Sequence, residues 1–294
     1  MNVRTGSVAF AASREALDLD AGWPLLRDAA AAAGLEPVVA VWEDDGVDWG
    51  AFDLVVANYT WGYVIRRERF LAWARAAARR TRLVNPEPVL AWNSEKTYLA
   101  DLARAGVPIV PTTWVAPGAP WEPPARDYVV KPCVASGGIE AARYVRQGVD
   151  VARRHVAALH ATGQTVMVQP YLEAVDAAGE TALVFFGGRF SHAVTKQGLL
   201  EADAGTVFGL WERQVVAAAT PRADQRAVAE RALRVVDAHF GRTAYARVDV
   251  VDGPDGTPVV IELELVEPSL FLDLAPGAAG RLAGELRGRL APGD

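Results

Sequence analysis

The sequence predicts a mixed α/β (α+β) fold that begins with a small parallel-sheet domain. Three observations support this prediction. Strand-like and helix-like segments alternate through the first 85 residues, a short apolar run ends in Lys131 before a glycine-rich loop, and an acidic hairpin occupies residues 244–270. Alternation of strands and helices is typical of a parallel sheet covered by helices. A short turn between two strands instead predicts an antiparallel pair.

The amino-acid composition is typical of a globular protein. Its 294 residues, 51% hydrophobic and 22% charged, suffice for one large domain or for two or three small ones. The net charge is −6 and no Lys/Arg cluster accompanies aromatic residues, so we expect no nucleic-acid partner. The single cysteine, Cys133, fits a reducing compartment. Neither a leader nor a membrane span is recognisable, so we expect a cytoplasmic protein without a membrane partner.

Residues 1–85 are expected to form the parallel-sheet domain. The elements predicted there alternate along the chain, with strands at 3–11, 36–42, 53–59 and 83–84 and helices at 24–33 and 66–80. Ligands of such sheets bind beyond the carboxyl ends of the strands. The third strand leads there into Tyr59, Thr60 and Trp61. We interpret these three as a substrate wall, and the alternative is a loop with ordinary packing aromatics.

The next helix is predicted from Asn93 to Gly106, with Asn93 or Ser94 as its N-cap. It carries Lys96 in its first turn. A cation at that position opposes the helix dipole unless an anion is also present. Lys96 therefore hints at phosphate binding.

A second lysine, Lys131, ends the apolar strand of residues 128–132. The loop that follows contains Ser136, Gly137 and Gly138, and a glycine-rich loop lets backbone N–H groups approach phosphate closely. A Ser-Gly-Gly sequence alone is more often a plain turn. Its position directly after a buried lysine favours phosphate binding.

The following strand, residues 166–172, has proline at its exit, where a ladder hydrogen bond is not needed. Backbone groups freed there could read the edge of an adenine; the residues concerned are Gln169, Pro170, Tyr171 and Leu172. Glu180 opens the next strand, which turns back at Gly187 and Gly188 into a strand carrying Lys196. Helices at 221–240 and 275–290 complete the predicted elements.

The acidic hairpin carries Asp249 on its first strand and Glu262 and Glu264 on its second. Residues i and i+2 of a strand share a face, so Glu262 and Glu264 project together. Carboxylates held so close repel unless a cation lies between them, and oxygen ligands without His or Cys suit Mg²⁺. The alternative is a solvated hairpin face. Because Arg247 alternates with Asp249 on the first strand, we favour a site.

Taken in order, these features resemble the ATP-grasp superfamily, and the resemblance covers the chain from about residue 86 to its end. It implies a pre-ATP-grasp domain at 1–85, a central subdomain with the phosphate loop at 86–168, and a C-terminal subdomain with the metal and adenine sites at 169–294. The motifs Trp92–Lys96, 179–186 (GETALVFF) and 262–272 (ELELVEPSLFL) are similar to those of cycloserine-pathway cyclo-ligases and related actinobacterial amino-acid ligases.

The resemblance implies ATP and two Mg²⁺ ions as cofactors and gives each candidate residue a role. Phosphates would contact Lys96, Lys131 and Lys196, with Ser136, Gly137 and Gly138 as the loop over the γ-phosphate. Gln169, Pro170, Tyr171 and Leu172 would hold adenine, and Glu180 the ribose. Asp249, Glu262 and Glu264 would bind the metals, with Glu262 as the bridge. Arg247 would stabilise an oxyanion, and the substrate would contact Tyr59, Thr60, Trp61, Arg247 and Ser269.

The implied activity is an ADP-forming carboxylate–amine ligase that works through an acyl-phosphate. Cyclisation of O-ureidoserine to cycloserine, in antibiotic biosynthesis, is one form; a dipeptide or γ-glutamyl ligase is another. A role without catalysis would be that of an ATP-binding regulatory protein without turnover, or of an interaction protein whose acidic hairpin faces a partner. Ligases of this kind are often homodimers. The chain departs from the pattern in having Glu264 where the third metal ligand is usually Asn, and Asn58 and Gly62 where relatives have Arg and Asp.

Overall fold

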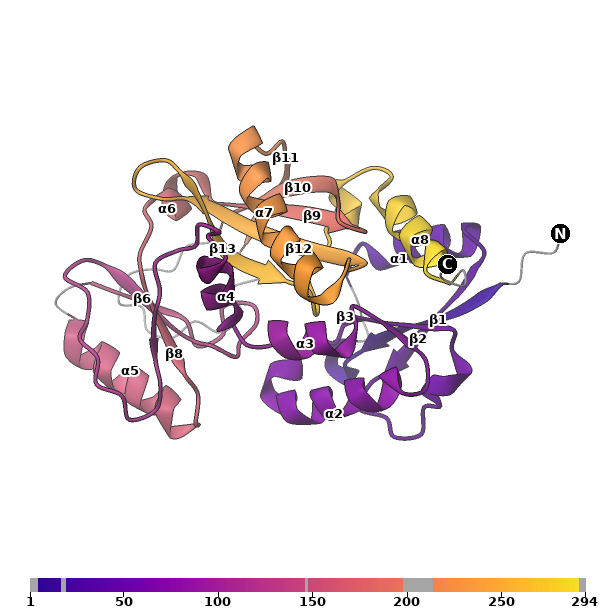
Figure 1. Cartoon of the computed structure of the whole chain (residues 1–294), viewed down its shortest axis with the longest axis horizontal. Coiled ribbons are helices and arrows are strands. Elements are labelled where there is room, and N and C mark those ends of the chain that lie inside the picture. The colour runs from indigo at the N-terminus through magenta and orange to yellow at the C-terminus, as the bar shows by residue number, and fades with distance from the viewer. Residues whose placement is uncertain (1–4, 17–19, 146–147, 198–213, 291–294) are drawn as a thin grey trace.

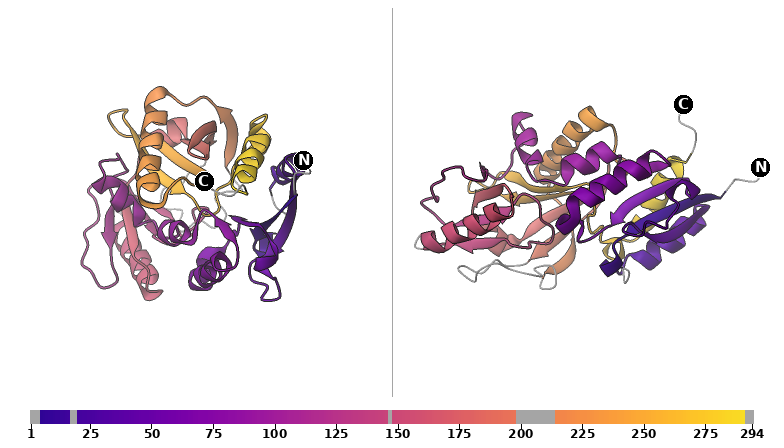
Figure 2. Two further views of the ribbon diagram at one scale, coloured as in Figure 1. Left: turned by 45° about the vertical axis from the view of Figure 1, so that its right-hand side comes forward. Right: turned by 90° about the horizontal axis from the view of Figure 1, so that it is seen from below.

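The structure is a computed structural model that describes residues 5–16, 20–145, 148–197 and 214–290. Three sheets organise these residues (Figure 1). The N-terminal domain and the sheet covered by helix α5 lie at opposite ends of the molecule, as Figure 2 also shows from below. The described residues include no helix long and apolar enough to cross a membrane.

The N-terminal sheet is fully parallel, as the sequence predicts, with the strand order β2-β1-β3-β4. Its strands are β1 (Gly6–Ala12), β2 (Leu35–Val41), β3 (Leu54–Tyr59) and β4 (Arg82–Val84). Side chains of β1 alternate between the two faces. Phe10 packs in the core that includes helix α1 (Trp23–Ala32), whereas Ala11 packs in the core that includes helix α2 (Arg67–Ala78). The two helices therefore cover the sheet between them.

The second sheet is antiparallel and has the order β5-β8-β6-β7. Its strands are β5 (Thr113–Val115), β6 (Tyr128–Pro132), β7 (Ala142–Tyr144) and β8 (Val166–Pro170). Helix α5 (Val149–Ala161) covers it with Ala152, Val156 and Leu159. These side chains recur at i, i+4 and i+7, the spacing that gives a helix one apolar face. The glycine-rich loop connects β6 to β7.

The third sheet has five antiparallel strands in the order β11-β10-β9-β12-β13. Its strands are β9 (Glu180–Phe186), β10 (Arg189–Gln197), β11 (Val215–Ala219), β12 (Tyr245–Asp252) and β13 (Pro258–Glu264). Helix α7 (Ala223–Phe240) packs on one face of this sheet. Helix α8 (Ala278–Gly288) lies against α1 and so ties the end of the described chain to the N-terminal domain. The short helix α6 (Ala174–Ala178) precedes β9.

The helix predicted from Asn93 to Gly106 is wrong, because two shorter helices occupy this part of the chain. Helix α3 (Glu87–Asn93) ends where the predicted helix begins, and α4 (Tyr98–Arg104) follows. Lys96 lies between them, with its backbone N–H donating to the carbonyl of Cys133 at 2.8 Å. That bond to another part of the chain replaces a helical one and turns the chain at this point.

Side chains from this region complete the outer edge of β13. Asn93 donates to the carbonyl of Leu263 at 2.8 Å and accepts from the N–H of Leu265 at 2.7 Å, while the hydroxyl of Tyr98 accepts from the N–H of Leu263 at 2.9 Å. Asn85, fully buried, donates to the carbonyl of Leu265 at 2.7 Å. A buried strand edge must have its polar groups satisfied. These bonds fix the direction in which the side chains of β13 point.

Candidate active site

One cavity of about 780 Å³ is lined by strands of the second and third sheets and by residues outside the strands of the N-terminal domain. Residues that the sequence singles out line it from the central and C-terminal parts of the chain: Lys96, Lys131, Ser136, Gly137, Gly138, Gln169, Pro170, Tyr171, Leu172, Glu180, Lys196, Arg247, Glu262, Glu264 and Ser269. The N-terminal domain contributes Glu15, Ala16, Asp20, Trp61 and Gly62. A concave site with a few converging charged groups is the usual form of a small-molecule site.

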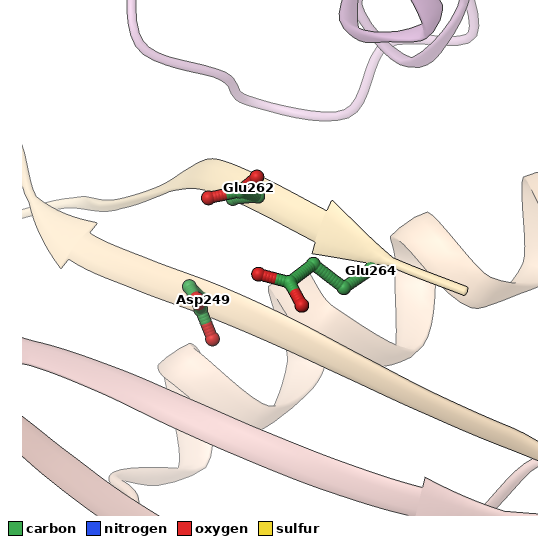
Figure 3. Close-up of side chains that lie close together, drawn as sticks. All are labelled: Asp249, Glu262 and Glu264. Carbon is green, nitrogen blue, oxygen red and sulfur yellow. The ribbon is translucent and has the colours of Figure 1, made fainter. Parts of the chain in front are cut away.

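The acidic hairpin has the geometry that its spacing predicts. In the register of β12 and β13, Asp249 lies opposite Glu262 and Arg247 lies opposite Glu264. Asp249, Glu262 and Glu264 each offer a carboxylate oxygen, and these oxygens lie within 4.8 Å of one another. Figure 3 shows the three side chains on neighbouring strands, with Glu264 reaching toward Asp249. All-oxygen donors at this separation fit a hard cation such as Mg²⁺.

Lys196 compensates the most deeply buried of these acids. Its Nζ lies 2.6 Å from Asp249 Oδ2 and 2.8 Å from Glu180 Oε2, and the Asp249 side chain is only 1% exposed. Burial lowers the pKa of Lys196, but Asp249 and Glu180 raise it further, so its net pKa lies above the ordinary value. Buried charges persist only when they are paired. Lys196 therefore keeps its charge beside the hairpin.

Arg247 is held by hydrogen bonds on three sides. Its Nε donates to Asp249 Oδ1 at 2.9 Å, its Nη1 donates to the carbonyl of Ser269 at 3.2 Å, and its Nη2 donates to Glu264. The guanidinium also lies over the ring of Phe271, 5.7 Å from the ring centroid. A planar fork bonded in this way has one orientation. Arg247 is thus a fixed cation that faces the cavity.

The three carboxylates differ in their pKa values. Burial raises the pKa of Asp249, but Arg247 and Lys196 outweigh burial and lower it. Burial likewise raises the pKa of Glu262, and Lys96 and Lys131 bring it below the ordinary value. At Glu264 burial prevails over Arg247, and with the help of its acidic neighbours it raises the pKa to about 7. The residue that stands where Asn is usual is therefore the one whose charge is least stabilised.

The lysines of the central part converge near the same acids. Lys96 Nζ lies 3.0 Å from Glu262 Oε1 and also donates to the carbonyl of Ala135, at the start of the glycine-rich loop. Burial lowers the pKa of Lys131, and Lys96 lowers it further against the attraction of Glu262. Within the described residues Lys131 forms no ion pair shorter than 4 Å. Two cations so close together favour a strongly anionic ligand.

The predicted adenine segment lies at the exit of β8. Gln169 and Pro170 pair with Val129 and Tyr128 of β6, and the Gln169 amide donates to the hydroxyl of Thr112 at 2.8 Å. The ring of Tyr171 stacks under a guanidinium, with Arg143 Cζ 3.6 Å from the ring centroid. These contacts hold the segment rigidly where it borders the cavity.

The substrate wall divides between core and cavity. Tyr59 is 1% exposed and packs against Trp23 and Trp61, and Thr60 is fully buried and donates to the carbonyl of Ala57. Neither lines the cavity, whereas Trp61 does. The structure therefore places Trp61, but not Tyr59 or Thr60, where a substrate could touch it. The other two lie beneath it in the core.

Sequence reasoning missed Glu267, which lines the cavity three residues beyond Glu264. It is 7% exposed, and neither carboxylate oxygen has a hydrogen-bond partner among the described residues. Burial raises its pKa well above the ordinary value, with Glu264 adding to the shift. The available signal was a lone acid directly before proline in a mostly apolar segment, Leu265–Leu270.

Comparisons of the chain with protein families, with known sequences and with solved structures all find DcsG proteins. Residues 8–85 match the family described as D-cycloserine synthetase DcsG, N-terminal domain. The cycloserine biosynthesis protein DcsG of Streptomyces lavendulae is 42% identical over 302 residues, which span 98% of this chain and 100% of the relative. The crystal structure of D-cycloserine synthetase DcsG is 39% identical, covers 97% of this chain and 100% of its own, and superposes with a TM-score of 0.88.

A more distant structure defines the fold alone. The RimK domain ATP-grasp protein of Sphaerobacter thermophilus is 21% identical and superposes with a TM-score of 0.64 over 99% of this chain and 100% of its own. The predicted ATP-grasp fold is therefore confirmed, including the parallel-sheet domain that precedes it.

Proposed function

The chain belongs to the D-cycloserine synthetase DcsG family of ATP-grasp ligases, and from this premise we propose how its own residues perform the reaction. The protein is an ATP-dependent ligase that forms an amide bond, and ligases of this fold bind ATP and Mg²⁺. What we propose is the substrate, the number of ions and the role of each residue. One observation supports all three: four cations and two carboxylates, Glu262 and Glu264, border one cavity beside a glycine-rich loop, and Asp249 lies directly behind these two acids.

The donor set fits the metal. Asp249, Glu262 and Glu264 would hold two Mg²⁺ ions, with Glu262 between them. When bound, Mg²⁺ withdraws charge from the phosphates and aligns them for in-line transfer. Until then Lys96, Lys196 and Arg247 balance the same carboxylates. Lys96 and Lys196 can turn toward phosphate once the acids face a metal, whereas Arg247 keeps its orientation.

The nucleotide would extend from the β8 exit to the acidic hairpin. Backbone groups from Gln169 to Leu172 would border adenine, and the Glu180 carboxylate would accept ribose hydroxyl groups. Lys96, Lys131 and Lys196 would balance the phosphate charge, and Ser136, Gly137 and Gly138 would cover the γ-phosphate. Backbone N–H groups of such a loop favour anions, and a closed loop excludes water.

The reaction begins with the substrate carboxylate. Its oxygen attacks the γ-phosphorus of ATP, the bond to the β-phosphate oxygen breaks, and ADP leaves an acyl-phosphate. A nitrogen then attacks the acyl carbon and forms the amide bond. Phosphate departs with the carboxylate oxygen and takes up the proton that the nitrogen loses. Arg247, already fixed by Asp249 and Glu264, is placed to bind the oxyanion that develops between these steps.

We propose a small amino acid as the substrate, with cyclisation of O-ureidoserine as the first candidate because the family is that of D-cycloserine synthetase. Trp61 and Ser269 would contact it from opposite domains. The presence of Asn58 and Gly62 where relatives have Arg and Asp keeps an intermolecular dipeptide or γ-glutamyl ligase as the second candidate. Gly62 lines the cavity without a side chain, so this position supplies no charge to the wall.

The division of the chain at residues 85 and 168 stays a prediction, as do a homodimer and a cytoplasmic location. The strands of the three sheets fall on successive segments, as β1–β4, β5–β8 and β9–β13, although the boundary at residue 168 lies within β8. A cytoplasmic location is consistent with the use of ATP.

The test is ADP release by the purified protein with Mg-ATP and a panel of amino acids, given alone and in pairs, with products identified by mass. For O-ureidoserine alone, we predict ADP and either a ring lighter by one water, or cycloserine after a water molecule hydrolyses the carbamoyl group to carbon dioxide and ammonia. Release only with a pair, and a product equal to their sum less water, supports the intermolecular ligase. Nucleotide binding without ADP release on any substrate contradicts a ligase and supports a regulatory protein.

A further inference from the structure

Glu267 is a buried carboxyl group that the ATP and metal chemistry leaves unused. It follows β13 and is 7% exposed, yet both of its oxygens lack a hydrogen-bond partner among the described residues. Leaving such a group unsatisfied costs about 1–3 kcal/mol and more for a charged one. Its persistence in a cavity wall points to a partner that the ligand supplies.

Several neighbours of Glu267 belong to the active site, and the buried core residues Tyr63 and Tyr245 also lie near it. Trp61 Nε1 donates to the backbone carbonyl of Glu267 at 3.2 Å and so holds this turn against the N-terminal domain. Glu264 raises the pKa of Glu267 and Lys96 lowers it. The side chain of Ser136 lowers it as well, although neither carboxylate oxygen of Glu267 meets the full geometry of a hydrogen bond. Glu267 thus lies between the metal-binding acids and the substrate wall.

The charged residues that the N-terminal domain contributes to the cavity wall are acidic. The described lining residues of the N-terminal domain include the acids Glu15 and Asp20 and no basic residue. Glu15 is already paired with Arg66 at 3.0 Å, and Asp20 accepts the N–H of Gly22 at 3.0 Å. Of these three acids, only Glu267 has both oxygens free of a hydrogen bond within the described chain. A wall of this kind favours a cationic group and disfavours a second carboxylate.

We propose that Glu267 binds the ammonium group of the amino-acid substrate. The inference rests on the proposed function and extends it to the polarity of the substrate: the ammonium group lies against Glu267, and the carboxylate lies toward Arg247 and the γ-phosphate. A substrate held at both charged ends has one orientation, which is what in-line attack requires. Glu267 is therefore a specificity residue that selects amino acids over other carboxylic acids.

A pair of ligands and a pair of proteins test this assignment. Binding of O-ureidoserine and of 3-(ureidooxy)propanoate, the same molecule without its amino group, is measured by calorimetry in the presence of Mg-ADP. In Glu267→Gln the dissociation constant for O-ureidoserine is expected to rise about 10- to 100-fold, the worth of one charge-assisted hydrogen bond. The dissociation constant for the deamino compound should change less than about 2-fold, because that compound has no ammonium group and so makes no such contact with Glu267.

Two further variants serve as controls for this test. Glu267→Asp keeps the charge on a shorter stem and should recover part of the affinity for O-ureidoserine. Glu285→Gln removes a part-buried carboxylate of α8, paired with Arg289 at 2.8 Å, that does not line the cavity, and it should leave both dissociation constants unchanged. Thermal unfolding of each variant shows that the comparison is made between folded proteins.

Equal loss of both ligands in Glu267→Gln, or no loss of either, overturns the assignment. In that case ADP release by the unaltered protein with O-ureidoserine still supports the ligase function. If the unaltered protein instead releases no ADP with any amino acid, the proposed function fails, and the assignment of Glu267 fails with it. The two failures are therefore distinguished by the unaltered protein.

Discussion

Two kinds of carboxylate lie at or directly behind the cavity wall. Asp249, Glu262 and Glu264 each lie beside a lysine or arginine, at separations of 3.0 Å or less. Glu267, three residues beyond Glu264, has no hydrogen-bond partner within the described residues. The first group retains its charge balance before any ligand arrives. Glu267 does not, so its burial lowers the stability of the fold.

The difference separates two requirements of the same site. Paired acids keep their geometry and can exchange a lysine for a metal without a large change in net charge, which suits a site that must bind and release a nucleotide in every cycle. An unpaired acid binds most strongly the one ligand that supplies its missing charge. The paired acids therefore serve the reaction common to the fold, and Glu267 serves the substrate of this chain. Four variants can break or sharpen this contrast.

The largest effect is expected from Glu262→Gln, which removes charge at the centre of the paired acids. ADP release should fall by on the order of 10³-fold or more, since a catalytic metal contributes several kcal/mol to the transition state. The measurement is steady-state ADP release at saturating Mg-ATP. Unchanged turnover in this variant would remove the metal assignment.

Arg247→Gln should lower kcat by about 10²–10³-fold, the usual cost of losing an oxyanion donor. The KM for ATP should change little, because the nucleotide phosphates contact the lysines. The readout is therefore the separation of kcat from KM. A rise in the KM for ATP with an unchanged kcat would instead place Arg247 among the phosphate ligands.

Lys196→Met tests the pairing itself. It leaves Asp249 and Glu180 without their shared cation, so the free energy of unfolding should fall by about 3 kcal/mol, as is usual when one partner of a buried ion pair is removed. The matched control is Arg226→Met, which breaks a half-exposed pair with Glu230 and should cost less than about 1 kcal/mol. Equal losses in urea unfolding would show that burial of the pair contributes nothing.

Glu267→Gln is expected to change stability by an amount that depends on pH and is small near pH 5. The folded-state pKa of Glu267 is raised, so the contribution of this group to stability is complete below the unfolded-state pKa of about 4.5 and is lost as the pH rises above it. Removing the ionisable group removes that loss. Relative to the unaltered protein, the free energy of unfolding of the variant should therefore rise by up to roughly 1.4 kcal/mol for each pH unit above 4.5.

Urea unfolding of both proteins at pH 5, 6 and 7 measures this difference. A difference that is constant with pH would show that Glu267 ionises as readily in the folded chain as in the unfolded one. Together with the binding data, a stability gain beside an affinity loss would identify an acid kept for its ligand at the expense of the fold.

Local patterns in the sequence were sufficient where one strand or one alternation determines the structure. The alternating segments of residues 3–84 predicted the parallel sheet, and the i, i+2 spacing of Glu262 and Glu264 predicted their common face. Both are consequences of backbone periodicity, which a single segment displays without its neighbours.

Where contacts from distant segments decide, the sequence was not sufficient. Asn93 has the features of an N-cap, but its amide satisfies the edge of β13 about 170 residues away, so the helix ends there instead of beginning. Tyr59 and Thr60 have the composition of a binding loop but are buried beneath Trp61. That Glu267 lacks a hydrogen-bond partner among the described residues can be seen only in the folded structure, because its neighbours come from distant parts of the sequence.

The most direct test of the central claim follows one oxygen atom. O-ureidoserine labelled with ¹⁸O in its carboxylate is turned over with Mg-ATP, and the phosphate released is examined by mass spectrometry. Activation through an acyl-phosphate transfers one carboxylate oxygen to phosphate, so the account predicts singly labelled phosphate in amounts equal to ADP. Unlabelled phosphate would mean that ATP is hydrolysed without activating the carboxylate, and label in AMP would mean an adenylate, either of which contradicts the proposed chemistry.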